Sequence, residues 1–283
     1  MNSEQLAWLI RRHGVEMTHI SHGSHIGAIL SVADIVAVLY NDVANISPEN
    51  LKDENRDRII LSKGHAGAAI YAALAEKGFF DREELKTHYA DGSRLSGHVS
   101  HKGVPGVEFS TGSLGHGACV AAGMALNAKL DKKPYYTYAI VGDGECDEGS
   151  IWEMALFANQ FKLNQFVVIV DHNKMQSLDF CENTLSLAPF AEKWKAFGWN
   201  VLDIDGHNHD ELRTAFAKAK ESADKPTVII SNTVKGKGIS FMEFDILWHY
   251  RFPHEGEEYD GALKELHAEM PEGVVDPYEE GTK

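Results

Sequence analysis

The chain has 283 residues, of which 43% are hydrophobic, 10% aromatic and 24% charged. This composition is ordinary for a globular protein and excludes disordered, coiled-coil and collagen-like classes. With 27 basic and 42 acidic residues the net charge is −15, so we expect no nucleic acid or membrane partner. We also expect no transmembrane segment, because we find no span that approaches eighteen apolar residues. Cys119, Cys146 and Cys181 lack CxxC spacing, which indicates reduced thiols and a cytoplasmic location.

Helical and strand patterns alternate along the chain. Residues 1–14 have an amphipathic helical pattern, and the other helical patterns cover 66–77, 117–129, 152–161 and 210–222. Short runs rich in β-branched residues predict strands at 58–61, 137–141, 166–170, 200–204 and 227–232. The alternation predicts an α/β protein with a Rossmann-like, mostly parallel sheet and helices on both faces. We expect one domain, 1–270, and a peripheral tail, 271–283.

Two strand ends carry groups that suit a metal ion. Gly142, Asp143 and Gly144 follow one strand, and Asn173 follows the next. In an open parallel sheet the carboxyl ends of strands meet at the ligand site, and a carboxylate, an amide oxygen and a backbone carbonyl near Met175 suit Mg²⁺ or Ca²⁺ with a diphosphate. As a bare tripeptide, Gly-Asp-Gly would indicate no more than a β-turn.

The same residues carry a resemblance to a known family. Gly142-Asp143-Gly144 followed by Asn173 resembles the fingerprint of thiamine diphosphate enzymes. Four further segments resemble the N-terminal, diphosphate-binding subunit of split transketolases: LSKGHA (61–66), PGVE (105–108), STGSLG (110–115) and KGKGISFME (235–243). The resemblance extends from about residue 3 to about residue 250, and it implies thiamine diphosphate and Mg²⁺ (or Ca²⁺) as cofactors.

The resemblance also implies roles for individual residues. The cofactor-binding residues would be His65, Gly112, Ser113, Leu114, Gly142, Asp143, Gly144, Glu145, Asn173 and His249. The metal ligands would be Asp143, Asn173 and the Met175 carbonyl, and the catalytic histidines His25, His65, His98 and His249. Imidazoles suit proton transfer near neutral pH.

Glu148 and Glu153 resemble acidic residues that face a partner domain and link two cofactor sites. The alternative is that they are charges favoured by the dipole at the start of a helix.

Two places depart from the family pattern. Gly23-Ser24-His25 reverses the usual order of its first two residues, and Tyr250-Arg251 follows His249 where the family usually has Gly. We predict that Arg251 contacts an anionic or modified sugar, because Arg can bind a carboxylate or phosphate with two hydrogen bonds. The alternative is that Arg251 faces solvent or an acidic surface.

The implied function is a two-chain transketolase that transfers a two-carbon ketol unit from a ketose, as a phosphate or modified sugar, to an aldehyde. The family's pyrimidine-binding domain would follow the segment near Phe241, and about forty residues are too few for it. We therefore expect an α2β2 assembly with a separate pyrimidine-binding C-terminal subunit. The alternatives are the cofactor-binding subunit of a 2-oxoacid decarboxylase or dehydrogenase and a non-catalytic regulatory homologue.

Five other histidines have no role in the resemblance. We expect them to be solvated surface or loop residues, and they are His13, His88, His207, His209 and His267.

Overall fold

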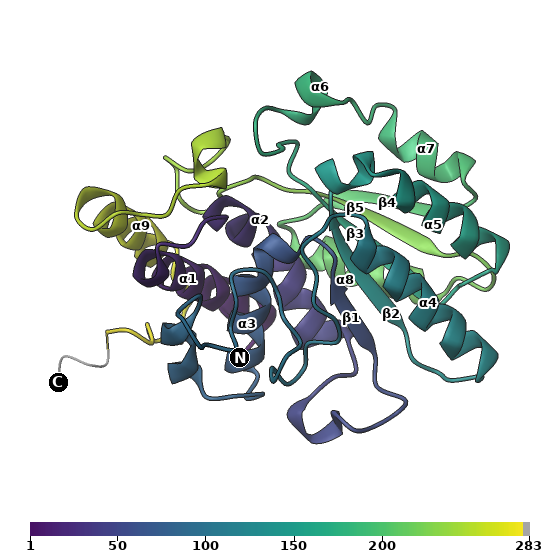
Figure 1. Ribbon diagram of the computed structural model, residues 1–283, viewed down its shortest axis with the longest axis horizontal. Helices are drawn as coiled ribbons and strands as arrows, with labels where there is room; N and C mark the ends of the chain where they lie inside the picture. Colours follow the sequence, from purple (N-terminus) through teal and green to yellow (C-terminus); the bar gives the residue numbers. More distant parts are fainter. Residues whose placement is uncertain (280–283) are drawn as a thin grey trace.

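A computed structural model describes residues 1–279 of the chain. Within these residues five strands form one parallel sheet in the order β1-β2-β3-β5-β4 (Figure 1). The strands are β1 Arg58–Leu61, β2 Thr137–Gly142, β3 Phe166–His172, β4 Asn200–Asp205 and β5 Thr227–Asn232. The predicted α/β class with a parallel sheet is confirmed, and each strand begins at the predicted residue.

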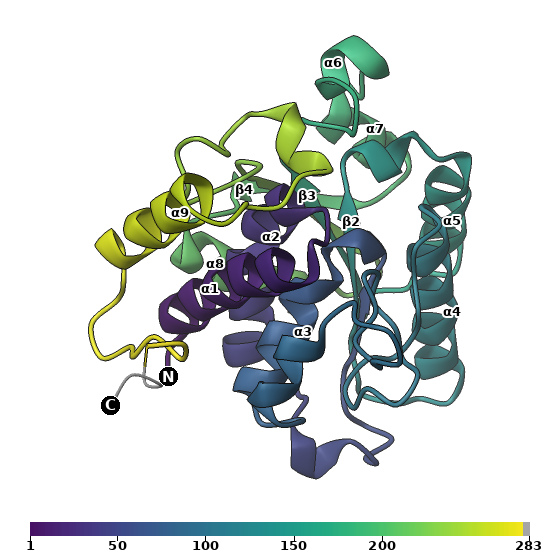
Figure 2. The same ribbon diagram turned by 60° about the vertical axis from the view of Figure 1, so that its left-hand side comes forward.

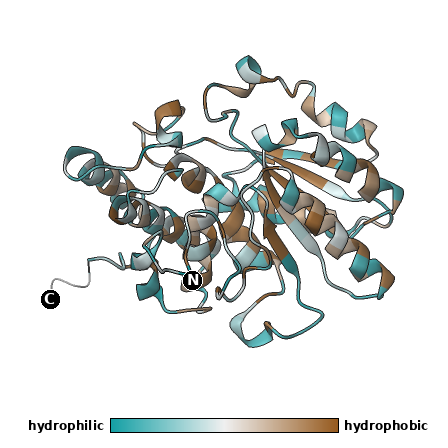
Figure 3. Cartoon of the chain, viewed as in Figure 1, coloured by the Kyte–Doolittle hydropathy of each residue, from teal (hydrophilic) through white to brown (hydrophobic). Residues whose placement is uncertain are grey.

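Helices cover both faces of the sheet (Figures 1 and 2). The helices are α1 Ser3–Ser21, α2 Ile26–Val38, α3 Gly67–Glu76, α4 His116–Leu130, α5 Gly149–Gln160, α6 Cys181–Thr184, α7 Phe190–Ala196, α8 His209–Lys220 and α9 Glu257–Ala268. Alternate strand residues point to opposite faces. Tyr138 and Ile140 of β2 pack with α1, α2, α3 and α8, whereas Ala139 and Val141 pack with α4, α5 and α7. The strands are accordingly hydrophobic over much of their length (Figure 3).

Helix α2 is buried along its whole length, and the sequence patterns missed it. All residues of Ile26–Val38 are buried, so no polar face marks the helix. With the following π-helix Leu39–Val43, the window Ile26–Val43 has 18 residues and a mean hydropathy of 1.7, so by length and composition alone it could cross a membrane, which the sequence patterns did not bring out. However, 83% of this window is buried inside the protein, and packing in the core accounts for its composition.

The C-terminal segment packs on α1. The indole of Trp8 donates to the Leu266 carbonyl of α9 at 2.7 Å. Asp276 is buried and accepts from Arg12 Nε at 2.7 Å, and the Tyr278 hydroxyl lies 2.7 Å from His13 Nδ1. Asp276 and Tyr278 therefore attach residues 271–279 to α1, although most of these residues are exposed or half-buried; the predicted division at residue 270 stays a prediction, and residues 280–283 lie outside the described part.

Several histidines expected at the surface are also buried. His13, His88 and His209 are at most 8% exposed. The ring of His13 lies 2.7 Å from Glu76 Oε1, and that of His209 lies 3.1 Å from Asp34 Oδ1. The sequence expectation was wrong because polar partners distant in the chain satisfy rings such as those of His13 and His209 inside the fold.

Candidate active site

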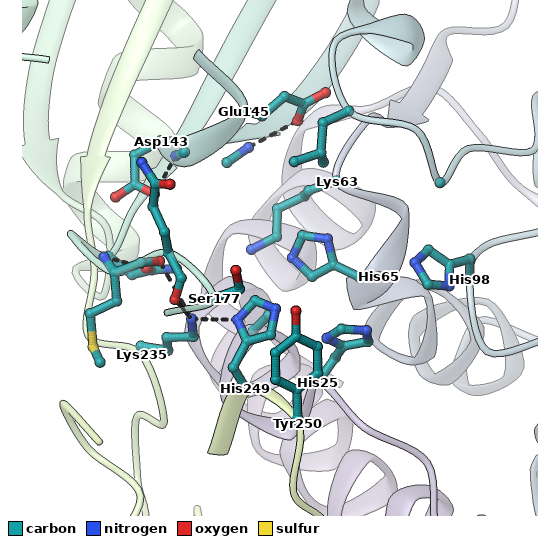
Figure 4. A pocket seen from close by; sticks show the side chains of 18 residues that line it. His25, Lys63, His65, His98, Asp143, Glu145, Ser177, Lys235, His249 and Tyr250 are labelled. Atoms are coloured by element: carbon teal, nitrogen blue, oxygen red, sulfur yellow. Dashed lines mark hydrogen bonds between the residues drawn. The ribbon is translucent and has the colours of Figure 1, made fainter. Parts of the chain in front are cut away.

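A pocket of about 240 Å³ lies at the carboxyl ends of β1, β2 and β3, where loops from several elements meet (Figure 4). Its lining combines glycines, charged groups and imidazoles: His25, Ala28, Lys63, His65, His98, Gly112, Leu114, Gly142, Asp143, Gly144, Glu145, Asn173, Met175, Gln176, Ser177, Lys235, His249 and Tyr250. Most of the residues that the sequence singled out come together here.

The oxygen atoms proposed as metal ligands are buried at one side of the pocket. Asp143 is 2% exposed, and its two oxygens accept from the backbone nitrogens of Gly144 at 2.7 Å and Lys174 at 2.5 Å. Burial, and then the neighbouring Asp171 carboxylate, raise the pKa of Asp143 to about 6. A nearby cation would stabilise the ionised form of a carboxylate in this setting.

Asp171 connects this side of the pocket to the core. Its carboxylate is completely buried and accepts hydrogen bonds from the Lys63 ammonium and the Thr233 hydroxyl, and from Ser31 Oγ at 2.6 Å. Burial opposes its ionisation, but Lys63 holds the pKa of Asp171 below its usual value. Asn173 Nδ2 lies 3.3 Å from the same carboxylate, so Asp171 orients the amide of Asn173.

Glu145 lines the pocket, and its carboxylate accepts hydrogen bonds from other groups of the protein. It accepts from Ser62 Oγ and from the backbone nitrogens of Gly115 at 2.9 Å and Gly142 at 3.1 Å. Burial raises its pKa, which these hydrogen bonds oppose. This geometry holds three loops together, and it differs from the direct cofactor contact implied by the resemblance.

Four imidazoles form a cluster on the other side of the pocket. The ring centre of His25 lies 5.1 Å from that of His65, 5.6 Å from His98 and 5.0 Å from His249. His249 Nδ1 lies 2.8 Å from the Lys235 ammonium. All four predicted catalytic histidines therefore reach one cavity from separate segments of the chain.

Burial and nearby positive charge keep these histidines neutral. Burial, followed by His98 and Lys235, lowers the pKa of His25 to about 4. Burial and Lys235 lower the pKa of His249 to about 3, and burial with Lys63 places that of His65 well below its usual value. The pKa of His98 is also lowered by burial. At pH 7 each ring can accept a proton at one nitrogen and donate a hydrogen bond from the other.

His25 begins α2 in a left-handed conformation, with φ of 77°. Its backbone nitrogen donates to the His249 carbonyl at 3.0 Å, and its ring Nδ1 is buried without a partner among the described residues. A strained backbone and an unpaired buried nitrogen are both features of functional sites.

Comparison with known proteins places the chain in a family. Residues 3–245 match the family of the transketolase thiamine diphosphate binding domain. The chain belongs to the transketolase family. It is 41% identical over 256 residues to an apulose-4-phosphate transketolase subunit of Phocaeicola vulgatus, covering 90% of each chain. It is 44% identical over 245 residues to a 6-deoxy-6-sulfo-D-fructose transketolase subunit of Clostridium sp. (strain MSTE9), covering 87% of this chain and 89% of that one.

Solved transketolases have the same fold. A transketolase from Campylobacter jejuni matches with a TM-score of 0.87 and 31% identity over 94% of this chain and 43% of that chain. Human transketolase is 36% identical over 241 residues, which are 85% of this chain and 38% of the human protein. The chain thus spans less than half the length of these two transketolases and most of the length of the two named subunits. The predicted membership of the transketolase family is confirmed.

The pocket of this transketolase chain fits thiamine diphosphate and a divalent cation. Asp143, Asn173 and the Met175 carbonyl offer the oxygen donors that Mg²⁺ and Ca²⁺ prefer. At Gly144 an added Cβ would lie 2.9 Å from the side chain of Gln176, and at Gly112 it would lie 3.5 Å from that of His98. The absence of side chains at these glycines leaves room for a ligand to approach the backbone.

Four predicted site residues lie outside the pocket. Ser113 is exposed beside the lining, and Glu148 and Glu153 are exposed at the start of α5. Arg251 pairs with Glu258, and its guanidinium lies 5.0 Å from the Trp248 ring centre. This geometry favours the alternative that Arg251 faces solvent or an acidic surface, because Glu258 of the same chain binds the guanidinium; contact of Arg251 with the substrate stays a prediction.

The sequence reasoning gave no role to two buried lysines of the pocket. Lys63 and Lys235 are each 1% exposed. Burial, and then the charge of Lys63, lower the pKa of Lys235 to about 8. Both lysines lie inside segments that carried the resemblance. A lysine followed by glycine, shortly after a buried strand, was the sequence signal that could have identified them as pocket residues.

Proposed function

We propose that the chain is the diphosphate-binding subunit of a two-chain transketolase, which transfers a two-carbon ketol unit from a ketose to an aldehyde. The observation that carries the proposal is the convergence of four neutral imidazoles with Asp143 and Asn173 in one pocket. The relatives from Phocaeicola vulgatus and Clostridium sp., named as transketolase subunits, support the two-chain form.

In this proposal Asp143, Asn173 and the Met175 carbonyl hold Mg²⁺ or Ca²⁺, which binds the diphosphate. Thiamine diphosphate, when bound, supplies a nucleophilic carbon and an electron sink for cleavage of the ketose C2–C3 bond. The ammonium groups of Lys63 and Lys235 add positive charge to the pocket for an anionic ligand.

The histidines would transfer protons and form hydrogen bonds with hydroxyl groups of the substrate. Since His25 and His65 are neutral at pH 7, each can accept a proton from a sugar hydroxyl or donate a hydrogen bond to a carbonyl oxygen. His249 is also neutral, and because its Nδ1 accepts from the Lys235 ammonium, its Nε2–H can donate a hydrogen bond to the substrate. His98 is on the exposed side of the cluster, where it can hold the terminal hydroxyl of the substrate.

The partner would be a pyrimidine-binding subunit, and we propose that it contacts the face of α5. Glu148 and Glu153 are exposed there, with Leu156 59% exposed on the same helix and Phe161 45% exposed just after it. Apolar side chains at such exposure, mixed with charge, are typical of protein interfaces. We also propose the α2β2 assembly that the resemblance to split transketolases implies.

We predict that this chain alone transfers no ketol units and that addition of a pyrimidine-binding transketolase subunit from the same organism gives turnover. A coupled assay with a panel of ketose donors and aldehyde acceptors, with thiamine diphosphate and Mg²⁺ present, measures this. Full activity of the chain alone would contradict the two-chain proposal. Failure of the reconstituted pair would favour a regulatory homologue, and turnover of 2-oxoacids in its place would favour the decarboxylase alternative.

The substrate class is proposed from the relatives, one named for apulose 4-phosphate and the other for 6-deoxy-6-sulfo-D-fructose. We propose a phosphorylated or otherwise modified ketose. Tyr250 lines the pocket, and its ring centre lies 4.6 Å from that of His249 and 5.9 Å from that of His25. It therefore narrows the space beside the catalytic cluster.

We predict that Tyr250→Gly changes the ratio of kcat/KM between small and large acceptors about tenfold, the scale expected for altered pocket volume. Arg251→Ala is the matched control: its guanidinium pairs with Glu258, so the ratio should stay within about twofold of wild type. Assays of the reconstituted enzyme with the panel of sugars give the kcat/KM ratio for both variants. Equal effects of the two variants would exclude Tyr250 as the determinant.

We also propose a cytoplasmic location, because Cys119, Cys146 and Cys181 are free thiols, as is usual in a reducing compartment. Detection of the protein in cell fractions would test this proposal.

A further inference from the structure

His207 lies in the loop between β4 and α8, outside the pocket lining. Its Nδ1 lies 2.6 Å from Asp34 Oδ2, and its Nε2 lies 2.8 Å from the backbone nitrogen of Val234. A backbone N–H can only donate, so Nε2 is the acceptor in this pair. The proton of the neutral ring is therefore on Nδ1, which donates to Asp34. The ring is fixed in one tautomer from both sides.

Asp34 is a firm anchor for this ring. It is a buried residue of α2, and it also pairs with the Arg11 guanidinium and lies 3.1 Å from His209 Nε2. Although burial opposes ionisation, Arg11 holds the pKa of Asp34 well below its usual range. The carboxylate is thus a permanent acceptor that joins α1, α2 and α8 to the loop of His207.

The backbone connects the Nε2 side of the His207 ring to the pocket. Val234 directly precedes Lys235, whose ammonium lies 2.8 Å from His249 Nδ1 and 3.0 Å from the Gln176 carbonyl oxygen. After Lys235 the chain is held by Gly236, whose nitrogen donates to the Gly27 carbonyl at 3.0 Å. The hydrogen bond from the Val234 nitrogen to His207 holds the backbone in the same way on the other side of Lys235.

We propose that His207 is a positioning residue of the active site, which holds the backbone at Val234 so that the Lys235 ammonium points into the pocket against His249. The inference rests on the proposed function, in which this pocket holds a diphosphate and a metal ion. Without the imidazole acceptor, the N–H of Val234 would turn toward water to be satisfied. Lys235 shares that peptide segment and would move with it.

Two substitutions at His207 separate its two hydrogen bonds. His207→Asn places an amide near the position of Nδ1, so it can still donate to Asp34 but cannot reach Val234. His207→Gln is one carbon longer and can present its carbonyl oxygen near the position of Nε2. His209→Asn is the matched control, because His209 also bonds to Asp34 while its second ring nitrogen lies 2.9 Å from Ser3 Oγ, remote from Val234.

Amide hydrogen exchange at Val234 and calorimetric titration with inorganic pyrophosphate and Mg²⁺ test the proposal on the full chain. For His207→Asn we expect exchange at Val234 to be about tenfold faster and pyrophosphate affinity about tenfold lower, the scale of one hydrogen bond. For His207→Gln both values should be within about threefold of wild type. His209→Asn should lower the thermal unfolding midpoint while leaving exchange at Val234 and pyrophosphate affinity unchanged.

Unchanged pyrophosphate affinity in His207→Asn, or an equal loss in His209→Asn, would overturn the proposal. A wild-type chain that binds no pyrophosphate would count against the proposed function, whereas the exchange rates would still report whether His207 holds Val234. A measurement on the unmodified chain is independent of the folding of any variant: the ¹⁵N shifts of His207 should show Nδ1 protonated and Nε2 unprotonated. The opposite tautomer would also overturn the assignment.

Discussion

Asp143→Asn should lower the affinity for thiamine diphosphate about a hundredfold in the presence of Mg²⁺. Loss of residues that only support a metal ligand costs up to this amount, so a direct ligand should reach it. The variant loses the ionised ligand and keeps the size of the side chain. Calorimetric titration of the full chain with thiamine diphosphate at saturating Mg²⁺ gives the ratio of the wild-type and variant affinities. Unchanged affinity would remove Asp143 from the set of ligands.

The matched control is Asp131→Asn, which removes the same charge at the exposed C-cap of α4 and should leave affinity unchanged. The pH dependence is a second check. Since the pKa of Asp143 is about 6 before metal binding, protons compete with the cation at lower pH. Wild-type affinity should therefore fall as the pH is lowered through 6 and level off above it, and Asp143→Asn should lack this dependence.

Asp171→Ala should reduce the free energy of unfolding by about 3–5 kcal/mol, because it leaves Lys63 buried without its partner. The same change removes the acceptor for Ser31 and Thr233 and the orienting contact to Asn173. Chemical denaturation at pH 7 measures the loss. A reduction below about 1 kcal/mol would mean that water or another group replaces the carboxylate.

Lys86→Ala provides the comparison for an exposed ion pair. Lys86 and Glu83 lie 2.5 Å apart, with side chains 50% and 68% exposed. Such pairs contribute less than about 1 kcal/mol, so the difference between the two variants reports the whole set of buried contacts that Asp171 makes, with Lys63 and with Ser31, Thr233 and Asn173. A similar loss in both would contradict the role assigned to the buried Lys63–Asp171 pair.

The sheet could be predicted from the sequence because its signal is local. Parallel strands buried on both faces are short runs of β-branched residues, and β1 and β5 have the predicted bounds. Helix α2 gave no such signal, because a helix buried on every side has no alternation of polar and apolar faces. Its burial depends on α1, α3 and the sheet, which only the tertiary structure brings together.

The same distinction applies to the site. Asp143 and Asn173 follow consecutive strands with glycines nearby, so strand order alone predicts that they meet. The pairing of Asp171 with Lys63 was not predictable, because the lysine that neutralises the Asp171 carboxylate is 108 positions away in sequence.

His207 shows where local sequence reasoning ends. The sequence determined the parallel sheet and the positions of the glycines, carboxylates and four pocket histidines, since those features depend on neighbours in the chain or on resemblance of short motifs. Whether a histidine is solvated or buried depends on partners that are distant in sequence: Asp34 is 173 positions from His207. Only the tertiary structure decided its tautomer and its attachment to Val234, because hydrogen bonds between distant segments form once the chain has folded.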